Sequence, residues 1–475
     1  MSFKSKQNYP IVGDYLKGDL LNRQVEVDFI LKIINESKQG LSLAIDGSWG
    51  SGKTWFGHSV RSKLNEKANA SVYINTWESD FSQDPFASLA SEFYKSLQDL
   101  SSKSQRKALL RRFEKIVSSA SKNIVGKLKT KINKIISKSS LELVDVLEII
   151  KIINDSKSGE LYDSIQLHNN YMKFVEDFKS LLADATKEII SYNKIDSFVI
   201  LVDELDRCKP TYAIEFLERV KHLFIVPGVV FVFLTNLQQL ESSIKAVYGE
   251  TFKSREYLKR FFDLIYELPQ NEAQSFVIAK VREYEILELA NQRTDEFVLE
   301  GSQGTFSQSF TILAKYYELT LRDIEQALMR TKVVLKFNQS TSNLNPIAIA
   351  FLVILHHHNQ ELLERIDKGE VSILDLFSGF LKSKVGTEFA QSYYGRYLYS
   401  LFEYTHNSNA GLQNQFDTRI TNWADILPID SNFANNSDDN FNYMVSFKQP
   451  FSNSRYSFNE FSKWVEVVKL SKRFT

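Results

Sequence analysis

Short apolar runs alternate with longer helix-like segments along the first part of the chain. We expect strands at residues 41–46, 71–75, 198–203, 229–236 and 261–269. The third run, FVILV, is continuously apolar, which is typical of a strand covered by helices on both faces of a parallel sheet. The pattern therefore predicts an α/β fold with a doubly wound parallel sheet.

A glycine-rich loop joins the first predicted strand to a segment that can continue as a helix. Glycine has no Cβ, so this backbone can curl with its N–H groups inward, and the helix N-terminus adds partial positive charge. Strand, loop and helix in this order form a phosphate-binding loop of the pattern G-x-x-x-x-G-K-[ST]. We expect nucleotide phosphates to bind through Gly47, Ser48, Trp49, Gly50, Ser51, Gly52, Lys53, Thr54 and Trp55.

Acidic residues follow the third predicted strand, and open parallel sheets bind ligands at the carboxyl ends of their strands. Asp203 and the hydroxyl of Thr54 would hold Mg²⁺, and Lys53 would reach the β and γ phosphates. Glu204 could orient a water for attack on the γ phosphate and accept its proton, which favours hydrolysis over binding alone. Asn236, at the end of the fourth run, could contact the γ phosphate or this water.

The sequence NKID at residues 193–196 has the form of the base-reading motif of GTPases. In a GTPase this motif ends a strand downstream of the acidic strand. Here it precedes the acidic strand and would lie at the opposite edge of the sheet from the phosphates. We interpret it as a solvent-exposed turn, and we expect ATP as the nucleotide.

The chain has 475 residues with 58 basic and 58 acidic side chains, so no net charge draws the whole molecule to nucleic acid or an anionic membrane. Its single cysteine, Cys208, excludes an intramolecular disulfide and fits a reducing compartment. The first residues lack the apolar stretch of a secretory signal, and the longest apolar run, at 347–355, is too short to span a membrane. We expect a cytoplasmic protein without transmembrane segments.

An inserted segment separates the two halves of the predicted sheet domain. Far more residues lie between the second and third predicted strands than a crossover helix needs. We therefore assign residues 1–100 to the first half of the core, 101–190 to a helical insertion and 191–269 to the second half.

Residues 101–140 of this insertion are strongly basic, with Glu114 as the one acidic residue. Two interpretations stay open. The basic face could bind nucleic acid or anionic lipid through phosphate contacts, or it could be a solvated face packed on the more acidic helix at 141–153. The basic residues are Lys103, Arg106, Lys107, Arg111, Arg112, Lys115, Lys122, Lys127, Lys129, Lys131, Lys134 and Lys138.

The sequence changes character in residues 338–475, which we assign to a mostly helical α+β interaction region. Residues 347–355 predict a buried helix, and residues 456–470 a final amphipathic helix. The stretch 401–456 is rich in Asn, Ser, Asp and aromatic residues, which predicts long loops. Three adjacent histidines, 356–358, would point about 100° apart on a helix and cannot converge on one metal.

Several blocks of the sequence, taken in order, resemble KAP P-loop NTPases. The resemblance implies an ASCE-type ATPase core, related to AAA+ and STAND proteins, with Glu204 as the catalytic glutamate. Many members carry membrane helices at the insertion, where this chain has a basic segment instead. The blocks are DLLNR (19–23), GSWGSGKT (47–54), INTWESD (74–80), DELDRCKP (203–210) and REYLKRFFDLIYELP (255–269).

The resemblance also implies a helical lid and arginines that act on the phosphates. We assign the lid to residues 270–337, where LTLRDIEQALMRTKVVL has helical apolar spacing and Arg322 is similar to a sensor arginine. Arg260 is similar to the arginine that related proteins present to their own or a neighbour's phosphate, and Arg207 is a third candidate. Each arginine could instead form a surface ion pair.

Two functions stay open. In the first, the protein is an ATPase switch whose hydrolysis moves the lid and the C-terminal region, and thereby controls a protein partner or assembly into a homo-oligomer. Because some bacterial KAP proteins exclude phages, the resemblance also implies a role in anti-phage defence. In the second, nucleotide stabilises a scaffold or adaptor with negligible turnover, which docks on nucleic acid or membrane through the insertion. A P-loop kinase would need an acceptor pocket that the sequence does not identify.

Overall fold

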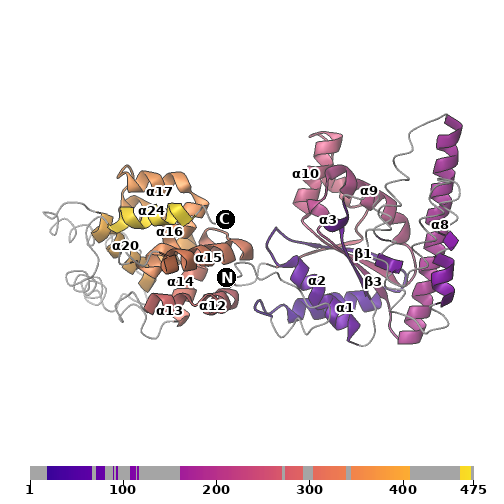
Figure 1. Ribbon diagram of the computed structural model, residues 1–475, viewed down its shortest axis with the longest axis horizontal. Helices are drawn as coiled ribbons and strands as arrows, with labels where there is room; N and C mark the ends of the chain where they lie inside the picture. The colour runs from indigo at the N-terminus through magenta and orange to yellow at the C-terminus, as the bar shows by residue number, and fades with distance from the viewer. Residues whose placement is uncertain are drawn as a thin grey trace. The chain divides into compact units, whose positions relative to one another are not determined.

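The computed structural model divides into two compact units, Met1–Gln270 and Asn271–Thr475 (Figure 1). The first unit holds an α/β sheet domain, and the described part of the second is helical. The described residues are 19–66, 71–80, 89, 92–94, 107–113, 115–116, 161–269, 273–291, 303–337, 344–406 and 460–471.

The first unit is built around a five-stranded parallel sheet with the strand order β2-β3-β4-β1-β5. This arrangement confirms the predicted α/β fold. The last strand begins later than predicted, because the backbone N–H of Phe261 still bonds to Leu258 in the preceding turn. The strands are β1 (Leu41–Asp46), β2 (Ser71–Asn75), β3 (Phe198–Asp203), β4 (Val229–Thr235) and β5 (Leu264–Glu267).

Helices cover both faces of this sheet (Figure 1). Successive side chains of a strand point to opposite faces, so Val199 and Leu201 of β3 pack on one side and Ile200 and Val202 on the other. This burial leaves the carboxyl ends of the strands as the natural place for a ligand. The first face is covered by α1 (Gln24–Glu36) and α2 (Lys53–Asn65), and the second by α8 (Leu161–Asn193), α9 (Pro210–Val220) and α10 (Leu237–Tyr248).

Part of the basic insertion packs on α8. Residues 107–113 are helical, and Leu109 and Phe113 are buried in the core that includes α8. Arg112 forms an ion pair with Asp184 of α8. This part of the insertion is therefore an amphipathic helix packed on the domain, and residues 117–140 lie outside the described residues.

Short helical turns connect the elements of this unit. They are α3 (Thr76–Ser79), η3 (Leu205–Arg207), η4 (Lys221–Leu223) and α11 (Ser254–Leu258).

The helices of the second unit share one hydrophobic core. This core joins the predicted lid, 270–337, to helices of the C-terminal region, and the limits of the five assigned segments stay predictions. The helices are α12 (Gln274–Glu283), α13 (Ile286–Asn291), α14 (Gln303–Tyr316), α15 (Leu321–Phe337), α16 (Pro346–His358), α17 (Gln360–Asp367), α18 (Ile373–Phe380), α19 (Lys384–Gln391), α20 (Tyr393–His406) and α24 (Glu460–Ser471).

Helix α16 lies at the centre of this core and confirms the predicted buried helix, because every residue from Pro346 to His356 is buried. Its N-cap is Asn345, whose side-chain oxygen accepts hydrogen bonds from two backbone N–H groups of the first turn. The three histidines contact different partners: His356 contacts Arg330, His357 contacts Asp323, and His358 contacts Tyr317. Within the described ranges, the structure contains no helix with the length and apolar character needed to cross a membrane.

Candidate functional site

The glycine-rich loop between β1 and α2 is curled, as its composition predicts. Gly50 and Gly52 have positive φ angles of 78° and 88°, which residues with a Cβ rarely adopt. A Cβ at Gly47 would lie 2.7 Å from Ser51 Oγ, so the loop is tightly closed there as well. Helix α2 begins at Lys53, and the first N–H groups of a helix lack partners within it. Curled backbone and helix N-terminus together form an anion-binding site.

Lys53 is buried against this loop and is 8% exposed. Its amine donates hydrogen bonds to the carbonyl oxygens of Gly47, at 2.6 Å, and Ser48, at 3.0 Å. Burial lowers the pKa of Lys53, whereas the carboxylates of Asp206 and Asp203 act in the opposite direction. The loop therefore contains a desolvated cation, and such a cation attracts a phosphate strongly.

Asp203, at the end of β3, is 1% exposed and meets the first turn of α2. Tyr73 Oη and the backbone N–H of Glu204 donate hydrogen bonds to its carboxylate, at 2.7 and 2.8 Å. The hydroxyl of Thr54 lies close enough to the same carboxylate to lower its pKa. Burial outweighs these hydrogen bonds and raises the pKa of Asp203 to about 6. Hydroxyl and carboxylate oxygens are ligands that Mg²⁺ prefers, so Thr54 and Asp203 fit that cation.

Glu204, the predicted base, follows Asp203 on a strained turn. Its φ angle is 60°, in the left-handed region, which costs a residue with a side chain about 1–2 kcal/mol. Its carboxylate forms an ion pair with Arg207, at 3.1 Å between Oε1 and Nη1. The Arg207 guanidinium in turn lies 5.8 Å from the ring centroid of Trp77. The predicted base and one candidate arginine are therefore partners of each other.

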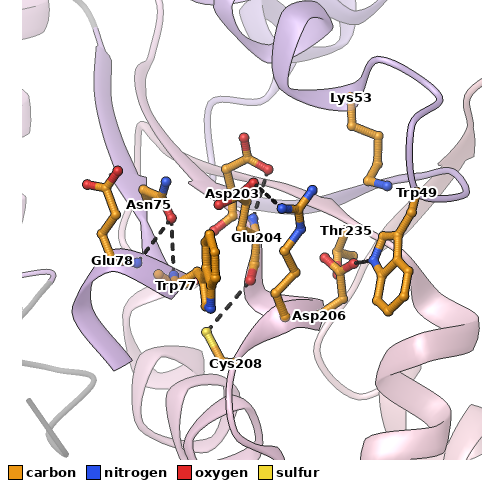
Figure 2. Close-up of polar contacts among 12 residues, drawn as sticks. Trp49, Lys53, Asn75, Trp77, Glu78, Asp203, Glu204, Asp206, Cys208 and Thr235 are labelled. Carbon is orange, nitrogen blue, oxygen red and sulfur yellow. Dashed lines mark hydrogen bonds and ion pairs between the residues drawn. The ribbon is translucent and has the colours of Figure 1, made fainter. Parts of the chain in front are cut away.

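Asp206 is a site residue that the sequence analysis did not single out. It lies in η3 and is 4% exposed. Its Oδ2 accepts a hydrogen bond from Trp49 Nε1 at 2.5 Å, and its Oδ1 accepts one from Thr235 Oγ1 at 3.3 Å (Figure 2). Asp206 belongs to the acidic block DELDR that begins at the end of β3, and its place in that block was the available signal.

Four other predicted residues lie around the loop and the neighbouring strand end. Asn236 caps α10, with its side-chain oxygen accepting a hydrogen bond from the Gln239 backbone N–H at 3.1 Å. Ser51 Oγ is buried and has no hydrogen-bond partner among the residues that the structure describes, which leaves a polar group available to a ligand. Trp55 packs, partly buried, on the core beneath α1 and α2, and Ser48 is exposed.

The remaining candidate arginines lie on other elements of the chain. Arg260 is exposed and precedes Asp263, whose backbone N–H bonds to the Ser42 carbonyl at 2.9 Å. Because Ser42 is at the N-terminal start of β1, Arg260 lies toward the edge of the sheet opposite the phosphate loop. Arg322 is exposed at the start of α15, in the second unit.

Comparison with known proteins identifies the domain. The model of the KAP family P-loop domain matches residues 23–328, more than half of the chain. The match includes the five strands, the glycine-rich loop and the acidic turn after β3, and it extends into α15. No curated protein matches the sequence. The chain belongs to the KAP family of P-loop NTPases.

Proposed function

We propose that this protein binds ATP with Mg²⁺ at the phosphate loop and hydrolyses it. The observation that carries the proposal is the position of Asp203, because this buried carboxylate at the end of β3 lies beside Thr54 in the first turn of α2 and so brings the acidic strand end to the phosphate loop. Lys53 adds a desolvated cation beside them. A polyphosphate with a divalent cation complements all of these groups.

Each residue has a distinct role in this proposal. The loop N–H groups and Lys53 bind the phosphates after the Lys53 amine leaves the carbonyl oxygens of its own loop. Thr54 and Asp203 would hold Mg²⁺, which offsets phosphate charge when bound. Glu204 orients a water molecule and accepts its proton once the carboxylate separates from Arg207. Separation of that pair also leaves the Arg207 guanidinium available to the phosphates.

We further propose that the nucleotide state controls movement and assembly. Helices α12 to α15 share their core with helices of the C-terminal region, so a lid movement triggered through Arg322 would move that region as well. Arg260 lies toward the sheet edge opposite its own loop, which supports contact with the γ phosphate of a second copy in a homo-oligomer. A setting in phage defence, with a protein partner, rests on the family resemblance alone.

The second candidate is a scaffold that holds nucleotide with negligible turnover. The ion pair between Glu204 and Arg207 favours it, because the carboxylate must leave this partner before it can orient a water molecule. In that case ATP would stabilise the first unit as a structural ligand, and the basic insertion would dock on nucleic acid or an anionic membrane.

The variant Glu204→Gln separates the two candidates when ATP binding is followed by calorimetry and hydrolysis by phosphate release. For a hydrolase we expect unchanged affinity and turnover at least about a hundredfold lower, since a positioned base typically contributes 10²–10⁴-fold. Glu215→Gln, on α9, is the matched control and should preserve both properties. Binding without phosphate release in the unchanged protein would support the scaffold, and absence of binding would exclude both candidates.

A further inference from the structure

One buried carboxylate connects three separate parts of the site. Asp206 lies in the turn after β3, Trp49 belongs to the phosphate loop, and Thr235 ends β4 (Figure 2). Both partners donate hydrogen bonds to its two oxygens, at 2.5 Å from Trp49 and 3.3 Å from Thr235. Asp206 has no salt bridge within the described part of the chain, so these bonds and the nearby Lys53 charge compensate its burial.

The indole of Trp49 is only partly held by packing. The residue remains 45% exposed, so hydrophobic burial alone does not explain its place in the loop. Its N–H group, in contrast, makes a short bond to a carboxylate, and hydrogen bonds to charged groups are among the stronger ones in proteins. The polar end of the side chain therefore fixes its position.

We propose that Asp206 is a positioning residue for the nucleotide, because its hydrogen bond to Trp49 fixes the phosphate loop against the ends of β3 and β4. The inference rests on the proposed nucleotide binding. A loop with glycine at residues 47, 50 and 52 has many conformations available, and its ordering costs free energy when a ligand binds. The hydrogen bond to Asp206 orders the loop before the nucleotide binds, so less free energy is lost on binding.

This role predicts a specific pattern of affinities. ADP and ATP both present phosphates to the loop N–H groups, so loss of the bond should weaken the two nucleotides equally. Trp49→Phe retains an aromatic ring and removes the N–H donor. We expect this variant to raise the Kd of both nucleotides about tenfold, the usual effect of losing a hydrogen bond to a charged group. The maximal rate of hydrolysis should change little, whereas KM should rise.

The test is a double-mutant cycle with calorimetric Kd values for ADP and a non-hydrolysable ATP analogue. Trp49→Phe should weaken binding in the unchanged protein and have no effect in an Asp206→Ala background, since the partner is already absent. Asp206→Asn keeps an oxygen acceptor, and in that background Trp49→Phe should weaken binding again. Trp77→Phe, at another exposed tryptophan close to the site, is the matched control and should bind like the unchanged protein.

The outcomes separate this inference from the proposed function. If the unchanged protein binds nucleotide and Trp49→Phe binds it equally well, Asp206 has no positioning role and the nucleotide site stands. Equal effects of Trp49→Phe in the unchanged and the Asp206→Ala proteins would also overturn the inference. If Asp206→Ala does not fold, the Asp206→Asn background decides. Its amide oxygen can still accept the hydrogen bond from Trp49, so an absent effect of Trp49→Phe in this background would overturn the inference. An unchanged protein that binds neither nucleotide would remove both proposals.

Discussion

Lys53 in the first unit and Arg330 in the second are both buried cations, 8% and 7% exposed, but their surroundings differ. Among the described residues, Lys53 hydrogen-bonds only to carbonyl oxygens of the loop that precedes it. Arg330 of α15 donates to Ser471 Oγ and to the Val468 carbonyl oxygen of α24, at 3.3 to 3.4 Å. The first cation is held by a loop that can rearrange, and the second joins two helices of a packed core.

This difference shows that burial alone does not tell what a charge does. In the first unit the buried charged groups lie where strands end, next to backbone N–H groups that lack a partner within the helix. A bound ligand can therefore form ion pairs and hydrogen bonds with them. In the second unit the Arg330 guanidinium forms its hydrogen bonds with other residues of the chain. These bonds connect α24, the last described helix, to the rest of the core. Substitutions in the first unit should therefore change nucleotide chemistry, whereas matched substitutions in the second should change stability.

The largest expected effect is at Lys53. Lys53→Met keeps the length of the side chain and removes its charge, so we expect the Kd for ATP to rise about a thousandfold, because several charge-assisted bonds to phosphate are lost. The melting temperature without nucleotide should not fall, since the substitution removes the cost of burying an ammonium group. Calorimetry and thermal denaturation measure the two quantities. Lys63→Met, at a partly exposed position of α2, is the control.

Arg260 sharpens the comparison, because it is an exposed cation of the first unit. We expect Arg260→Ala to lower turnover about a hundredfold at high protein concentration, with unchanged ATP affinity, since an arginine supplied in trans acts mainly on the transition state. Turnover per chain should rise with concentration in the unchanged protein and stay flat in the variant. Lys259→Ala, at the neighbouring exposed position, is the control. Concentration-independent turnover in the unchanged protein would contradict the role in trans.

Arg330→Met is the matched test in the second unit. We expect the free energy of unfolding of this unit to fall by about 2 kcal/mol, because the Val468 carbonyl and the His356 ring each lose a partner inside the core. ATP affinity and turnover should be unchanged. Denaturant unfolding, monitored by proteolytic cleavage at α24, measures this loss of unfolding free energy. A variant of ordinary stability with impaired nucleotide binding would contradict the division between the units.

Much of the first unit could be predicted from sequence because its signals are local. The continuous apolar run of β3 and the positive φ angles that Gly50 and Gly52 supply are properties of short segments. The contacts of Asp206 and Tyr73 could not be predicted in the same way. Each depends on which strands are neighbours in the sheet, and that order is set by packing of the whole domain.

The second unit shows the same limit more strongly. Helical spacing predicted α15 and a continuous apolar run predicted α16, but neither pattern can tell which helices share a core. The contacts of Arg330 with a helix more than a hundred residues later arise only in the assembled fold. The arginine looks like an ordinary helix-surface residue in the sequence, because the same residue type is usually exposed there.

Arg207 tests how the charges of the first unit depend on each other. If it holds Glu204 in position, Arg207→Ala should lower turnover about tenfold while ATP and ADP affinities stay equal to those of the unchanged protein. If the guanidinium contacts the γ phosphate, ATP affinity should fall and ADP affinity should not. Phosphate release and calorimetry with both nucleotides give the answer. Arg219→Ala, on α9, is the control, because its ion pair lies on the surface of the same unit.

The smallest expected effect is a pH dependence of stability from His58, whose ring stacks on Tyr73, the residue that donates to Asp203. Burial, with a smaller effect of Arg61, lowers the pKa of His58 from 6.5 to about 4. As pH falls from 7 to 5 the unfolded chain binds a proton at this position and the folded chain does not, so folding loses stability. We expect a loss of about 1 kcal/mol after solvent screening, or about 2 °C in melting temperature.

His58→Phe isolates this effect, because phenylalanine keeps an aromatic ring against Tyr73 and cannot bind a proton. The melting temperature of the variant should change less between pH 7 and pH 5 than that of the unchanged protein, with both measured without nucleotide. Other groups titrate equally in the two proteins, so the difference between the two profiles reports His58 alone. Parallel profiles of melting temperature against pH would mean that the His58 ring is protonated or exposed in the folded state. The stacked contact of His58 with Tyr73, which donates to Asp203, would then be weaker than the geometry implies.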